Sequence, residues 1–102
     1  MKVMICQPMY GKTEEYIHEE RKELVRQLES EGYEVVNTIF TDEYLAKNRP
    51  NDCHFGIWAL AKSLEILSQV DGLVCMPGWE DARGCKIEVQ CAKDYGKFVK
   101  YL

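Results

Sequence analysis

Apolar residues fall along the chain in two alternating kinds of segment. Short apolar-rich runs occur at residues 2–6, 33–36, 72–76 and 97–101, and their length is that of buried β-strands. Between these runs, apolar residues recur every three to four positions, as along one face of an amphipathic helix. The pattern predicts a β-α-β-α-β-α-β order, in which right-handed crossovers make the strands parallel. The expected fold is one α/β domain over residues 1–102, a flavodoxin-like three-layer α/β/α sandwich with strand order 2-1-3-4.

Turn and cap residues place the three predicted helices. The first should begin near Thr13, a fair N-cap, and end at Gly32, and its core face consists of Ile17, Leu24, Val25 and Leu28. The second should run from about residue 54 to 68, and the residues expected to face the sheet are Ile57, Leu60, Ala61, Leu64 and Leu67. The third should begin near Gly84, with Gly96 as its C-cap. Residues 37–53 are polar, which predicts a long loop of a length often found in lids.

One charged residue interrupts the apolar face of the third helix. At helical spacing this face reads Gly84, Ile87, Glu88, Cys91, Ala92 and Tyr95. Glu88 would lie near a helix N-terminus above the carboxyl edge of a parallel sheet, where open α/β folds bind ligands. The helix dipole favours its ionised form while burial raises its pKa, a combination that suits a nucleophile or a base. The spacing alone favours the plainer alternative, a glutamate at the margin of the face that reaches water.

Charge and composition narrow the class of partner. The net charge is −4, so the chain has no basic surplus for a polynucleotide backbone, and a small ligand is the better expectation. No apolar stretch approaches the roughly 20 residues of a membrane span. Phe55 and Trp58 are interpreted as core residues of the second helix rather than as a base-stacking platform.

Cysteine and histidine usage indicates a reducing compartment and no metal. The five cysteines include no C-x-x-C pair, and no signal-peptide pattern opens the chain, so a cytoplasmic location is expected. Cys6 and Cys75 lie in strand-like runs and should be core residues. Cys85, beside Arg83 and Lys86, is a weaker candidate nucleophile. His18 and His54 lack metal-ligand spacing.

A phosphate-binding loop can be excluded. Gly11-Lys12-Thr13 follows the first strand, as a P-loop would, but the glycine required five positions earlier is Cys6, and Pro8 removes a backbone donor. No G-x-G-x-x-G sequence follows the strand either, so a dinucleotide site is not expected.

Three motifs together resemble the nucleoside 2-deoxyribosyltransferase-like family, and within it a branch of short, uncharacterised phage and bacterial proteins of the DUF4406 type. They are the turn Pro8-Met9-Tyr10-Gly11, Asp71 at the start of the third strand, and Pro77-Gly78-Trp79 followed by Gly84-x-x-x-Glu88. The resemblance covers nearly the whole chain and implies a deoxyribosyltransferase-like fold. In the enzymes of this family, the glutamate matching Glu88 attacks the anomeric carbon of a deoxyribosyl group. The chain departs from them at Ser63, where they carry aspartate, and at Ala82, where they carry serine or aspartate.

The resemblance implies transfer or hydrolysis of the N-glycosidic bond of a 2'-deoxynucleoside or deoxynucleotide, with Glu88 as nucleophile and no metal or organic cofactor. Trp79 and Tyr10 would form the walls of the base pocket, and free amides at the starts of the first and third helices would bind hydroxyl or phosphate oxygens. Asp81 or Glu80 would stand in for the missing polar groups. The full set of expected substrate-binding residues is Gln7, Pro8, Met9, Tyr10, Gly11, Gly78, Trp79, Asp81, Arg83 and Gly84.

Two further expectations remain: one is an alternative function without catalysis, and the other is the oligomeric state. The departures at Ser63 and Ala82 motivate an alternative function, a non-catalytic module that binds a nucleotide or sequesters a nucleotide-derived signal on the same fold. Members of the resembled family commonly associate, which implies a homodimer or a larger homo-oligomer. Trp58, Phe55 and Tyr44 are the candidate contacts because exposed aromatic residues favour interfaces.

Overall fold

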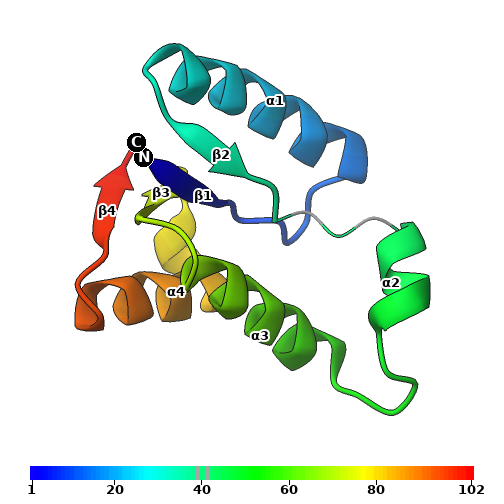
Figure 1. The fold of residues 1–102 in the computed structure, drawn as a ribbon. Coiled ribbons are helices and arrows are strands. Elements are labelled where there is room, and N and C mark those ends of the chain that lie inside the picture. The colour runs from blue at the N-terminus through cyan, green and yellow to red at the C-terminus, as the bar shows by residue number, and fades with distance from the viewer. Residues whose placement is uncertain (39, 41) are drawn as a thin grey trace.

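The computed structural model describes residues 1–38, 40 and 42–102 and contains one sheet of four parallel strands (Figure 1). The strands are β1 (Lys2–Cys6), β2 (Glu34–Val36), β3 (Gly72–Cys75) and β4 (Phe98–Tyr101). They are ordered β2-β1-β3-β4, which confirms the predicted order. The centre of the sheet is set by Met4, which is paired with Val36 on one side and Leu73 on the other.

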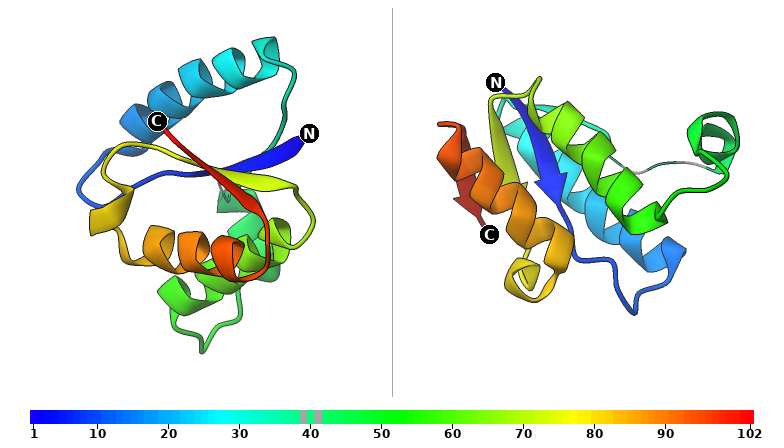
Figure 2. Two further views of the ribbon diagram at one scale, coloured as in Figure 1. Left: turned by 90° about the vertical axis from the view of Figure 1, so that its left-hand side faces the viewer. Right: turned by 90° about the horizontal axis from the view of Figure 1, so that it is seen from below.

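Helices cover both faces of this sheet, as expected for a three-layer sandwich. Helix α1 (Glu14–Ser30) lies on one face, and α3 (Phe55–Leu67) and α4 (Arg83–Asp94) lie on the other (Figure 2). A short 3-10 helix, η1 (Trp79–Asp81), leads from β3 into α4. No helix in the described part of the chain is both long and apolar enough to cross a membrane.

The alternation of side chains along the central strands divides the core in two. Val3, Ile5 and Val74 pack with residues of α1, whereas Met4, Cys6, Leu73 and Cys75 pack with residues of α3 and α4. Both sets are buried because each strand presents successive residues to opposite faces of the sheet. Cys6 and Cys75 are therefore core residues, as predicted.

The predicted limits of α1 are confirmed by its caps. The hydroxyl of Thr13 accepts a hydrogen bond of 3.2 Å from the amide of Tyr16. The helix ends at Ser30, and Gly32 follows with φ 94°, a left-handed conformation that favours glycine. Gly96 has φ 75° just after the end of α4 and plays the same part there.

The segment 37–53 is not the continuous loop predicted from its polar composition. It contains α2 (Asp42–Asn48), in which Asp42 and Glu43 occupy the first turn and Lys47 the last, so that these charges match the helix dipole. The helix is too short for apolar periodicity to reveal it, and none of its residues is buried. Positions 39 and 41 of the predicted loop lie outside the described residues.

Helix α3 makes less contact with the sheet than its apolar spacing predicted. Among its residues only Leu67 is buried, whereas Ile57 is 66% exposed and Ala61 is exposed as well. The first half of α3 extends past the sheet toward α2 (Figure 1). Apolar residues in this half therefore have no strand to cover.

The interpretation of Phe55 and Trp58 as core residues is wrong. Trp58 is half-buried in an aromatic cluster, with ring centroids 6.0 Å from Phe40 and 6.4 Å from Tyr44. Phe55 lies at the edge of this cluster, 6.2 Å from Trp58, and remains exposed. The cluster joins α2 to α3 outside the main core.

Candidate functional site

A cavity of about 650 Å³ opens where β1 ends, and its lining includes Glu88, Arg21 and Cys85. Its walls come from the segments that follow β1 and β2 and from α1, α3 and the start of α4. The connection after β1 crosses one face of the sheet, and the connection after β2 crosses the other, which makes this edge a topological switch point. Open α/β sheets bind their ligands in such a crevice.

Glu88 lies in the wall of this cavity and is only 8% exposed. It is the sixth residue of α4, so the helix carries it past the end of β1 toward Ser63 on α3. Burial raises the pKa of its carboxyl group, while hydrogen bonds from Cys6 and Ser63 and the charge of Arg21 act in the opposite direction. The structure thus excludes the alternative in which Glu88 is an ordinary exposed glutamate.

The buried face of α4 is nevertheless not the one predicted around Glu88. Its buried residues are Cys85, Glu88, Val89 and Ala92, whereas Ile87 and Tyr95 are exposed. The helix is rotated about its axis relative to the prediction, so that Cys85 and Val89 are buried in place of Ile87 and Tyr95. The reason is that α4 packs against β3 and β4, and Val89 joins the core cluster of Leu73 and Cys75.

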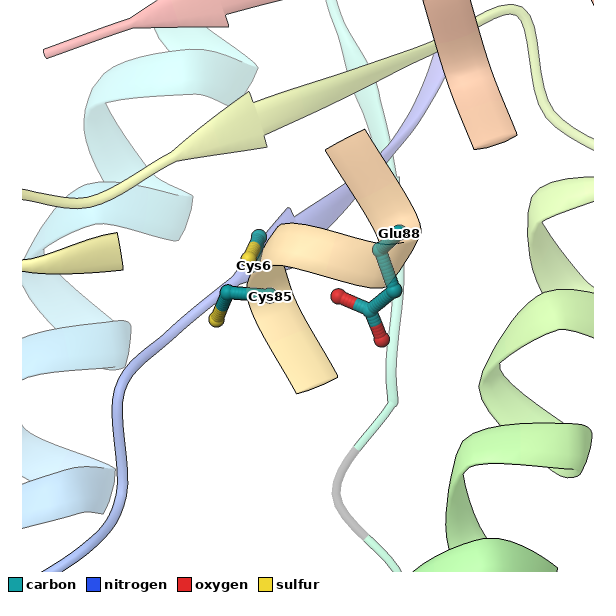
Figure 3. A group of neighbouring side chains, drawn as sticks. All are labelled: Cys6, Cys85 and Glu88. Carbon is teal, nitrogen blue, oxygen red and sulfur yellow. The ribbon is translucent and has the colours of Figure 1, made fainter. Parts of the chain in front are cut away.

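Two thiols adjoin the carboxylate of Glu88. Figure 3 shows Cys6 at the end of β1 against α4, with Cys85 and Glu88 projecting from the first two turns of that helix. The two sulfur atoms and a carboxylate oxygen all lie within 4.8 Å of one another, a ligand set that could hold a zinc-like cation. Hydrogen bonds with Cys75 and Cys85, together with burial, raise the pKa of the Cys6 thiol. The Cys6 side chain also forms a hydrogen bond with Glu88, which acts to lower the pKa of that carboxyl group.

A buried arginine forms the opposite wall of the cavity, and it was not among the residues predicted for the site. Arg21, on α1, is 6% exposed. Its Nε donates to Oε1 of Gln7 at 2.9 Å, and its Nη1 donates to the hydroxyl of Thr38 at 2.9 Å. Burial lowers the pKa of Arg21 to about 10, so the guanidinium remains charged at neutral pH. A sequence signal for it exists, because Arg21 interrupts the apolar face of α1 as Glu88 interrupts that of α4.

Six of the ten predicted substrate-binding residues line the cavity. They are Gln7, Met9, Tyr10, Asp81, Arg83 and Gly84. Tyr10 is fully exposed, whereas the Gln7 side chain is buried and engaged with α1. Ser63 and Ala82, the two departures from the resembled family, line the cavity as well.

The other four predicted residues, Pro8, Gly11, Gly78 and Trp79, lie outside the cavity lining. The ring of Trp79 instead packs 5.3 Å from that of Tyr101 on β4, which takes it away from Glu88. Gly78 has φ 92° and lies against Pro8, where an added Cβ would be 3.6 Å from its Cγ. Pro8 and Gly78 therefore shape the two turns without facing the ligand, and Trp79 is not a wall of this pocket.

The starts of the two helices near the cavity differ in their capping. Thr13 caps α1 through its side chain and so engages the amide of Tyr16, one of the donors predicted to bind a ligand there. At α4 the N-cap is Ala82, which makes no side-chain cap hydrogen bond. The first turn of α4, where Arg83 and Gly84 line the cavity, therefore offers amide donors and the positive end of the helix dipole to a ligand.

The comparisons with known proteins place the chain in a family without assigning it a reaction. The model of a family described as a domain of unknown function, DUF4406, matches residues 1–101. No curated protein and no solved structure matched the chain. The match agrees with the branch expected from the motifs, whereas kinship with the nucleoside 2-deoxyribosyltransferases stays a prediction.

Proposed function

We propose that this chain, which belongs to the family described as domain of unknown function DUF4406, breaks the N-glycosidic bond of a 2'-deoxynucleoside or deoxynucleotide through a glutamate nucleophile. The observation that carries the proposal is the position of Glu88. It is a buried carboxylate in the wall of a cavity, held by two hydrogen bonds and facing open space rather than a cationic partner within ion-pair distance among the described residues. Such a group is ready to attack an electrophilic carbon.

The reaction would proceed by double displacement. A Glu88 oxygen attacks C1' of the sugar and forms an ester bond, while the C1'–N bond breaks and its electron pair leaves with the base. Water or a second base then attacks C1' and passes its proton to the group that protonated the leaving base, while the ester bond to Glu88 breaks. The two inversions retain the configuration at C1'. Hydrolysis and transfer differ only in which acceptor enters.

The neighbours of Glu88 support this role. Donors from Cys6 and Ser63 orient the carboxylate and hold its pKa below the value that burial alone would produce. Ser63 thus supplies a hydrogen bond at the position where the resembled enzymes carry aspartate. Asp81 lines the cavity from η1 and is the candidate to give the leaving base its proton, whereas Glu80 is not part of the lining.

The size and lining of the cavity suit a nucleoside-sized ligand. Ligand pockets usually measure about 300–1,000 Å³, and this one measures about 650 Å³. Met9 and Tyr10, in the turn after β1, are the candidates to cover the base. The uncapped amides at the start of α4 would bind sugar oxygens.

Chromatography tests the proposal directly. Deoxynucleosides and their 5'-monophosphates would be incubated with the protein, with and without an acceptor base. We expect wild type to release free base, or to form an exchanged nucleoside when the acceptor is present, and the Glu88→Gln variant to do neither. The Glu65→Gln variant, which changes an exposed glutamate on α3, serves as the matched control and should retain activity. Equal turnover by wild type and Glu88→Gln would exclude Glu88 as the nucleophile.

One observation favours a second candidate function, the non-catalytic capture of a nucleotide. Ala82 places a methyl group in the lining where the resembled enzymes carry a polar side chain. A binding module needs the cavity but not that polar group. A nucleotide that co-purifies with the protein and is released intact on denaturation, with no base freed from any substrate, would support this candidate over catalysis.

We also propose a homodimer, because the first half of α3 carries apolar side chains that the chain itself leaves uncovered. Ile57 and Phe55 are exposed there, beside the aromatic cluster of α2 and α3. The neighbouring residues Gly56, Ala59 and Leu60 line the cavity, so a second copy seated on this face would lie close to the ligand.

A further inference from the structure

Arg21 has one donor nitrogen for which the described residues supply no partner. Its Nε and Nη1 are each engaged at 2.9 Å, by Gln7 and Thr38 respectively. Its Nη2 is buried and forms no hydrogen bond with any residue among 1–38, 40 and 42–102. No carboxylate in the same part of the chain lies within 4.0 Å of the guanidinium. A buried, charged and incompletely satisfied donor destabilises the fold, and such groups call for a functional explanation.

The surrounding side chains hold this guanidinium in one position. Gln7, which accepts from Nε, is itself fixed through Nε2 by the carbonyl of Ile17 at 3.0 Å and by Glu20 at 3.3 Å. Glu20 is in turn paired with Lys12 at 2.9 Å. The partners of Arg21 thus belong to a connected network that leaves the third nitrogen in a set place. That arrangement is typical of a preorganised binding group rather than of a side chain trapped by chance.

The charge of the cavity differs in sign from that of the whole protein. Three cations line it, namely Arg21, Arg83 and Lys86, against two carboxylates, Asp81 and Glu88. The chain as a whole has a net charge of −4. An excess of positive charge in the crevice where the sheet topology places a ligand favours an anionic ligand over a neutral one.

We propose that Arg21 binds the phosphate of a deoxynucleoside 5'-monophosphate, so that the nucleotide, and not the neutral nucleoside, is the ligand of this cavity. The proposal rests on the proposed function, because within that substrate class phosphate is the only anionic substituent. A phosphate oxygen would accept the hydrogen bond that Nη2 does not make in the structure, once the side chains that cover this buried nitrogen shift to admit the ligand. Charge-assisted hydrogen bonds of this kind are shorter and stronger than neutral ones.

The test measures binding to the full chain carrying Glu88→Gln, so that no ligand is consumed. Isothermal titration would compare a deoxynucleoside with its own 5'-monophosphate. We expect the monophosphate to bind at least about tenfold more tightly, since a hydrogen bond to a charged group supplies that much. Equal affinity for the two ligands would overturn the proposal before any change at Arg21 is made.

Substitutions in α1 then assign the preference to one residue. Arg21→Met, in the same Glu88→Gln background, should lose the monophosphate preference while its affinity for the nucleoside stays within about twofold of the parent. Arg26→Met is the matched control, because Arg26 is an exposed arginine on the same helix, and it should keep the full preference. Arg21→Lys keeps the charge, so it should retain part of the preference and covers the case in which the methionine variant fails to fold. The assignment would be overturned if a folded Arg21→Met or Arg21→Lys variant kept the same preference for the monophosphate as the parent protein.

The outcomes separate this inference from the catalytic proposal. A monophosphate preference that depends on Arg21, with no base released by wild type, would refute catalysis and retain the nucleotide site. Base released at equal kcat/KM from nucleosides and monophosphates would support catalysis and refute the role of Arg21.

Discussion

Replacing Glu88 by glutamine tests whether the ionised carboxylate of this residue destabilises the folded protein. Burial raises the pKa of Glu88 despite the hydrogen bonds from Cys6 and Ser63 and the nearby charge of Arg21. A folded-state pKa above the unfolded one means that ionising this carboxylate destabilises the folded protein. Glutamine keeps the shape and one acceptor oxygen but carries no charge. We therefore expect Glu88→Gln to be more stable than wild type at neutral pH.

The gain in stability should depend on pH with a defined sign. Below the ordinary glutamate value of 4.5 the carboxyl group is protonated in the folded and unfolded states alike, so the two proteins should be equally stable. As pH rises through the folded-state pKa, wild type loses about 1.4 kcal/mol for each unit between the two pKa values. This net shift already includes the opposing effect of the donors from Cys6 and Ser63. The variant should therefore be more stable than wild type at pH 8, and each 1 kcal/mol gained would raise Tm by about 4–8 °C.

Calorimetric or denaturant unfolding of both proteins between pH 4 and pH 8 measures this difference. Glu65→Gln controls for the loss of a carboxylate as such, because Glu65 is exposed and forms a surface ion pair with Lys62 at 3.6 Å. Its stability difference from wild type should stay within about 0.5 kcal/mol across the range. If Glu88→Gln is instead less stable than wild type at pH 8, the ionised carboxylate stabilises the fold and the reasoning about the site is wrong.

Three further predictions address the site, the sheet and the assembly. Ser63→Ala removes a donor that lowers the pKa of Glu88, so the acidic limb of kcat/KM against pH should move to higher pH, and an unmoved limb would show that Ser63 does not act on Glu88. Gly72→Ala places a Cβ 2.4 Å from the ring of Phe98 and should cost about 1–3 kcal/mol in denaturant unfolding, whereas an unchanged midpoint would contradict the pairing of β3 with β4. Light scattering should give twice the mass of the 11.9 kDa chain, and Ile57→Glu should halve it; a single-chain mass for wild type would refute the dimer.

Apolar patterning predicted most of the fold because the strands obey simple rules. Residues 3–6 and 72–76 are continuous apolar runs, and a strand buried on both faces needs that composition. Thr13 and Gly32 marked the limits of α1 for the local reasons that govern helix caps. Helix α2 was not predicted because its sequence has no apolar periodicity. Its only helix signal is the placement of charges, acidic in the first turn and basic in the last.

The site was predicted in part, and the missing parts have tertiary causes. Glu88 could be identified because it interrupts an apolar face, and Arg21 interrupts the face of α1 in the same way. Sequence spacing could not predict that Thr38 accepts a hydrogen bond from Arg21, because this contact depends on where the end of β2 lies relative to α1. Trp79 was assigned to the pocket through the Pro77-Gly78-Trp79 motif of the resembled family. Its ring instead packs against Tyr101, a residue 22 positions along the chain that the sheet brings beside it.

The central claim is that Glu88 forms a covalent bond with the sugar, and mass spectrometry of the trapped enzyme tests it most directly. The protein would be mixed with a deoxynucleoside 5'-monophosphate or a deoxynucleoside, quenched rapidly and digested. The account predicts that the peptide containing Glu88 gains the mass of one deoxyribosyl group, with its phosphate where the nucleotide was supplied, and that fragmentation places this mass on Glu88. The Glu88→Gln variant should carry none. Release of base by an enzyme whose Glu88 stays unmodified under conditions that trap the intermediate, or an adduct at Cys85, would contradict the claim.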